Sequence, residues 1–66
     1  MENNYIKLDS FLKYNNLVGS GGEAKMLIQE GLVKVNSEVE TRRGRKLYKG
    51  DRVEFDSEEF VVDMVE

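Results

Sequence analysis

The residues best suited to bind a charged ligand form one run, Arg42-Arg43-Gly44-Arg45-Lys46, with four cations in five positions. Guanidinium groups bind phosphate with two parallel hydrogen bonds and stack on unpaired bases. Charged side chains on a surface are common in themselves, but a dense basic run in an acidic chain favours a polyanionic partner. We call residues 42–46 the basic run and expect it to be an exposed connection.

Charge is divided unevenly along the 66 residues, whose net charge is −3. Residues 1–33 carry −1, residues 34–52 carry +4 and residues 53–66 carry −6. Because a polyanion responds to the local field, the middle segment matters more than the total. The acidic segment is expected to form an edge strand whose charges discourage aggregation, or to repel RNA from its side of the molecule.

The composition excludes most catalytic chemistry. The chain has no Cys and no His, so it lacks disulfides, thiolate nucleophiles, the usual zinc ligands and the commonest general base. Asp56, Glu58 and Glu59 lack the spacing of a calcium loop. We therefore expect no enzymatic activity, no cofactor and no metal. No apolar run reaches the roughly 20 residues of a membrane span, and the start lacks a signal-peptide pattern, which predicts a cytoplasmic protein.

Apolar spacing predicts two helices, over residues 8–15 and 21–30. The first is indicated by Leu8, Phe11 and Leu12 at helical intervals. For the second, Ser20 and Glu23 match a capping box, in which the Glu carboxylate accepts from the Ser backbone N–H. Gly31 is then suited to end the helix.

Alternating patterns after Gly31 predict strands. A hairpin is expected over 33–35 and 39–41 around Asn36-Ser37, with a third strand from Val53, a turn over 56–59 and a closing strand over 60–65. The chain is thus expected to be one α+β domain, with two N-terminal helices on one face of a small antiparallel or mixed sheet.

Four segments in order, residues 6–12, 20–25, 30–36 and 50–55, resemble the S4 RNA-binding domain, specifically the small stand-alone bacterial S4-domain proteins of the YaaA/YbcJ type. The resemblance covers residues 6–55. It implies the αL-motif fold, in which two helices and a sheet grip structured RNA, and it implies no catalysis, because enzymes with this module keep catalysis in other domains.

Gly21-Gly22 depart from the family pattern, because many S4 domains have Arg in this turn. The two glycines could bring backbone N–H groups close to a phosphate, or could simply allow a tight entry into the helix.

Further cations complete the expected RNA-binding surface. Lys7 stands where the family usually has a basic residue, Lys25 should flank the core face of its helix, and Lys34 should project from its strand away from the core. The predicted RNA-binding residues are Lys7, Gly21, Gly22, Lys25, Lys34, Arg42, Arg43, Arg45 and Lys46.

Exposed apolar and aromatic residues leave alternatives open. Tyr5, Tyr14 and Tyr48 could stack on bases, but a tyrosine more often buries its ring and leaves its hydroxyl in water. Met26 should face away from the core. The sequence therefore predicts a monomeric module that binds structured RNA, either ribosomal or tRNA-like, with a ribosomal particle as a further candidate partner. The alternative is an adaptor that binds protein on the same scaffold.

Overall fold

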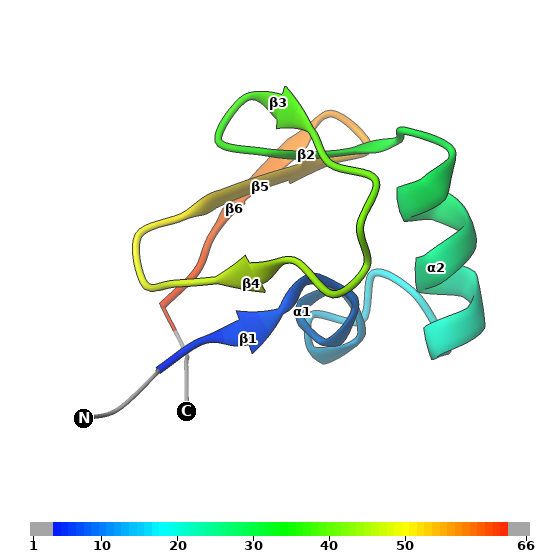
Figure 1. The fold of residues 1–66 in the computed structure, drawn as a ribbon, viewed down its shortest axis with the longest axis horizontal. Coiled ribbons are helices and arrows are strands. Elements are labelled where there is room, and N and C mark those ends of the chain that lie inside the picture. The colour runs from blue at the N-terminus through cyan, green and yellow to red at the C-terminus, as the bar shows by residue number, and fades with distance from the viewer. Residues whose placement is uncertain (1–3, 64–66) are drawn as a thin grey trace.

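The computed structural model describes residues 4–63 and has two helices and six short strands (Figure 1). In chain order they are β1 (Ile6–Lys7), α1 (Leu8–Tyr14), α2 (Gly21–Gln29), β2 (Val33–Val35), β3 (Glu38–Val39), β4 (Lys46–Leu47), β5 (Arg52–Phe55) and β6 (Glu58–Val61). The predicted α+β class is confirmed, and both helices end within one residue of the predicted position.

The strands form two separate antiparallel units. β1 pairs with β4 in a two-stranded ribbon, while the larger sheet has the order β3-β2-β5-β6. The connection from β3 to β4 runs past the start of α1 and joins the two units (Figure 1). This connection contains the first four residues of the basic run, and the fifth, Lys46, begins β4, so the predicted connection is one residue too long. The fold places the run between the sheet, the ribbon and a helix.

One apolar core holds these parts together. Its buried side chains come from both helices, from the inner face of β2 and β5, and from β4 and the loops; they are Leu8, Phe11, Leu12, Val18, Ala24, Ile28, Val33, Val35, Leu47, Val53 and Val62. Since Leu47 is fully buried, the ribbon is anchored to the same core as the larger sheet.

Helix α2 begins largely as its sequence predicts. The Ser20 hydroxyl accepts the backbone N–H of Glu23 at 3.2 Å. The predicted reciprocal bond of the capping box is wrong. The Glu23 carboxylate accepts the backbone N–H of Gly19, at 2.9 Å, and not that of Ser20. At the other end Gly31 adopts a φ of +81°, the left-handed conformation that glycine takes without steric cost.

Two tight turns set the sheet register. Asn36-Ser37 and Asp56-Ser57 both have positive φ at both residues, the pattern of the turns that best match strand twist. The predicted turn over 56–59 is therefore too long, since β6 already begins at Glu58 and ends at Val61. Residues 64 and 65 of the predicted closing strand lie outside the described residues.

Ser57 occupies a left-handed conformation, with a φ of 67°, that costs an L-residue roughly 1–2 kcal/mol and glycine almost nothing. Ser57→Gly is expected to raise stability by about 0.5 kcal/mol after the added chain entropy of glycine, which is a Tm increase of roughly 2–4 °C by thermal denaturation. Ser10→Gly, the same change inside α1, should instead lower the Tm. A lower Tm for Ser57→Gly would contradict this account of the turn.

Candidate nucleic-acid interface

The basic run is held in place by its own backbone. Helix α1 has no side-chain cap at Lys7. Instead, the N–H of Leu8 donates to the carbonyl of Arg45 at 2.9 Å and the N–H of Asp9 donates to the carbonyl of Arg43 at 3.1 Å. Because the first N–H groups of a helix need external acceptors, the basic run serves as the cap of α1. Its position relative to the helix is thereby fixed.

Glu40 anchors two of the run's arginines from inside. Glu40 directly follows β3, at the start of the connection to β4, and is only 6% exposed. One carboxylate oxygen accepts both the backbone N–H and Nε of Arg42, each at 2.9 Å. The other oxygen accepts Nη1 of Arg45 at 2.7 Å and Nη2 of Arg42 at 3.2 Å. The buried charge is thus fully paired.

These hydrogen bonds lower the pKa of Glu40 to about 2. The bonds from the Arg42 side chain are the main cause; burial acts in the opposite direction, and the bond from Arg45 adds to the lowering. The same pairing raises the pKa of Arg42. Glu40 therefore stays ionised at any physiological pH, and the two arginines stay oriented by it.

The four cations of the basic run are not equivalent. The Arg42 side chain remains 74% exposed although it is paired with Glu40, and Arg45 is 30% exposed. Arg43 and Lys46 have no ion-pair partner among residues 4–63. An open depression of about 480 Å³ is lined by Arg42, Gly44, Arg45 and Lys46. The run therefore presents two pre-oriented guanidinium groups beside two cations free to meet a ligand.

The ribbon extends this basic surface. In its register Ile6 faces Leu47 and Lys7 faces Lys46, so with Ile6 and Leu47 packed on the core the two lysines lie on the outer face. Tyr5 directly precedes β1 and Tyr48 directly follows β4, and their ring centroids are 6.1 Å apart. We call these four residues the ribbon face. Sequence periodicity does not reveal the ribbon face, because strands of two residues have no detectable period.

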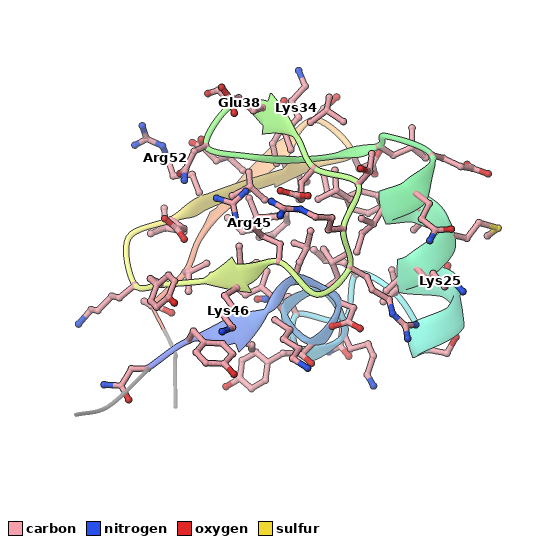
Figure 2. All side chains as sticks on the ribbon, viewed as in Figure 1. Lys25, Lys34, Glu38, Arg45, Lys46 and Arg52 are labelled. Carbon is pink, nitrogen blue, oxygen red and sulfur yellow. The ribbon has the colours of Figure 1, made fainter. Side chains whose placement is uncertain are left out.

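The side chains of Arg45, which directly precedes β4, and of Lys46, its first residue, point to opposite sides of the chain (Figure 2). This alternation directs Arg45 toward buried Glu40 and Lys46 toward the ribbon face, where its Nζ lies 4.9 Å from the centroid of the Tyr5 ring. Lys46 thus connects the depression of the basic run with the ribbon face.

Two other predicted cations lie elsewhere. Lys25 is on α2, at the right of the view in Figure 2, and Lys34 is on β2, at the top, and each lies apart from Lys46. Both side chains are exposed, as predicted. Lys34 lies in register with Val39 on one neighbouring strand and with Glu54 on the other. The structure therefore brings Lys7 together with Lys46 of the basic run, whereas Lys25 and Lys34 lie apart from that pair.

Gly21 and Gly22 form the first turn of α2. A methyl group added at Gly21 would meet nothing within 4 Å, and one added at Gly22 would lie 3.9 Å from the Ser20 hydroxyl oxygen. Neither glycine has positive φ. The geometry of the turn therefore does not require glycine at either position.

The described residues hold neither a candidate metal site nor a candidate membrane-spanning helix. Within residues 4–63, no group of three or more acidic, His or Cys side chains is arranged to hold a metal. In the same region, no helix has the length and apolar character needed to cross a bilayer.

Comparison with known proteins identifies the family. The S4 domain family model matches residues 1–63. The "Probable ribosome maturation protein RlbA" of Bacillus subtilis (strain 168) is 51% identical over 51 residues, which cover 77% of this chain and 72% of that protein. The "Putative RNA-binding protein YbcJ" of Escherichia coli (strain K12) is 41% identical over 51 residues, 77% of this chain and 73% of that protein. The chain belongs to the S4 domain family.

Removing the Glu40 charge tests its structural role. Glu40→Gln is expected to lower the free energy of unfolding at pH 7 by roughly 1.5–3 kcal/mol, because charge-assisted hydrogen bonds to both arginines are lost. The folded pKa of about 2 lies below the ordinary value of 4.5, so this contribution is complete above pH 4.5. The difference between wild type and variant should therefore shrink as the pH falls from 4.5 toward 2.

Urea denaturation across this pH range measures the effect. Glu38→Gln, which removes an exposed charge on β3, is the matched control and should change stability by less than about 0.5 kcal/mol. A Glu40→Gln difference that is absent at pH 7, or that stays constant down to pH 2, would contradict the anchoring role.

Proposed function

We propose that this chain is a non-catalytic RNA-binding module that docks on structured RNA, with ribosomal RNA as the target, through the basic run and the ribbon face. Membership of the S4 domain family supports an RNA-binding role, as does the name of the Escherichia coli relative. The name of the Bacillus subtilis relative favours ribosome maturation as the setting. Such a target would place the chain in the cytoplasm.

The observation that carries the proposal is the fixed geometry of the basic run. Its backbone caps α1, and its two paired arginines are oriented by a buried carboxylate. A cation that is already oriented loses little side-chain entropy when it binds phosphate, so pre-orientation favours affinity.

Phosphate binding makes affinity depend on salt. If four or five phosphates are neutralised, log affinity should fall against log salt concentration with a slope of about −3 to −4.5, because each contact releases condensed counterions. The negative net charge of the chain does not oppose this, since the acidic residues are concentrated after residue 53.

An adaptor function has one observation in its favour. Met26 is half exposed on α2, as the sequence predicted, on an element that carries no part of the basic run. A protein partner that remains bound to the tagged chain after complete nuclease treatment of a lysate would support the adaptor.

The RNA-binding residues are best tested with cations that Glu40 does not use. Replacing Arg42 or Arg45 would leave a buried charge short of partners and confuse folding with binding. The variant Arg43→Gln/Lys46→Gln avoids this and should weaken binding to a structured ribosomal RNA fragment by roughly 10- to 100-fold at 0.1 M salt, with a salt slope less negative by about 1.5 to 2.

The matched control is Lys13→Gln/Lys34→Gln, which makes the same change in net charge on α1 and β2. Fluorescence anisotropy titrations at several salt concentrations should show a much smaller loss of RNA affinity for this control than for Arg43→Gln/Lys46→Gln. Equal losses in the two variants would reject the basic run as the site, and absence of RNA binding by the wild type would reject the function.

A further inference from the structure

We propose that the ribbon face is a stacking site for one unpaired nucleotide of the bound RNA, with the ring of Tyr48 as the platform. The proposal rests on the RNA-binding function and adds to it the kind of RNA recognised: a helical element with an unstacked base beside it, such as an overhang or a bulge. The basic run would hold the backbone of the same RNA.

Exposure and orientation make Tyr48 suitable as a platform. Tyr48 is 47% exposed, whereas Tyr5 is more deeply buried. The planes of the two rings are inclined at 55°, so they do not stack face to face, and Tyr5 does not lie flat on the Tyr48 ring. An aromatic ring left open in this way can accept a base, whatever the base identity, because every base has a π face.

Hydrogen bonds hold the backbone around Tyr48 in place, which favours a stacking platform. Its N–H donates to the Asp51 carboxylate at 2.8 Å, and its carbonyl accepts the N–H of Asp51 at 2.9 Å. Leu47, its neighbour, is fully buried in the core. Little conformational entropy is therefore lost from the chain when a base stacks there.

Charge on the ribbon face points to an anionic ligand. Lys7 and Lys46 lie directly opposite each other across the two strands, and like charges in that position are destabilising. The positive charge of Lys46 is partly compensated by the Tyr5 ring, whose centroid lies 4.9 Å from the Lys46 Nζ. A phosphate between the two lysines would remove the repulsion, so the pair suits the backbone of a nucleotide whose base stacks nearby.

The ribbon face and the basic run are continuous. Lys46 belongs to both, because it contacts the Tyr5 ring and also lines the depression with Arg42, Gly44 and Arg45. An RNA strand whose phosphates lie in the depression would therefore pass next to the two tyrosines. A base in a duplex interior has both faces covered by its neighbours and cannot stack on the tyrosines, whereas an unpaired base can stack on them.

The test compares two short RNA duplexes, one blunt and one with a single 2-aminopurine nucleotide as a 3′ overhang, by anisotropy and by 2-aminopurine fluorescence. Wild type is expected to bind the overhang duplex more tightly and to quench its fluorescence. Tyr48→Leu should lose roughly 5- to 100-fold in affinity for the overhang duplex and also lose the quenching, while its affinity for the blunt duplex stays near that of wild type.

Two controls separate stacking from folding. Tyr48→Phe keeps the ring and should behave as wild type. Tyr14→Leu removes a tyrosine that is 66% exposed on α1, outside the ribbon face, and should leave both affinities unchanged. Thermal denaturation of each variant identifies any that fails to fold, and Tyr5→Leu then provides a second test of the same face.

Each outcome decides between the two proposals. If wild type binds both duplexes equally without quenching, or if Tyr48→Leu and Tyr14→Leu behave alike, the stacking site is overturned, while RNA binding by the basic run stands. If wild type binds neither duplex and no other structured RNA, the proposed function fails and the stacking site fails with it.

Discussion

The ion pairs of buried Glu40 are the interaction on which the proposed interface depends. A carboxylate with 6% exposure is costly unless its charge is met, and here both oxygens accept hydrogen bonds from arginine. The connection after β3 must therefore bring Arg42 and Arg45 back over Glu40. This path places the carbonyls of Arg43 and Arg45 against the first N–H groups of α1. One buried charge thus sets the shape of the basic run and, through it, the cap of a helix.

The fixed run then determines where the remaining cations lie. Because Arg45 turns inward to Glu40, strand alternation turns Lys46 outward, opposite Lys7 and over the Tyr5 ring. The result is a basic surface with tyrosines at one end, on a chain whose net charge is −3. Of the acidic residues after residue 53, Glu54, Glu58 and Glu59 lie on β5 and β6, which do not contribute to this surface.

The sequence predicts those parts of the fold that depend on local interactions. The helices follow from apolar spacing, the start of α2 from the Ser20 cap, and its end from Gly31, because each signal acts within a few residues. The β1–β4 ribbon could not be predicted in the same way, since it joins residues about forty positions apart through strands of two residues. The burial of Glu40 could not be predicted from the alternating pattern either, because an acidic residue in a strand pattern gives no sign of it. Its burial results from arginines two and five positions later, and that spacing is the only local signal.

An NMR titration of the labelled chain with a structured ribosomal RNA fragment would test the central claim most directly, because it reports every backbone amide at once. The account predicts that the largest shift changes fall on residues 42–46 and on the ribbon face around Lys7 and Tyr48, with little change along β6. Changes concentrated on α2 around Met26, or spread evenly over the molecule, would contradict a pre-formed RNA interface at the Glu40-anchored run.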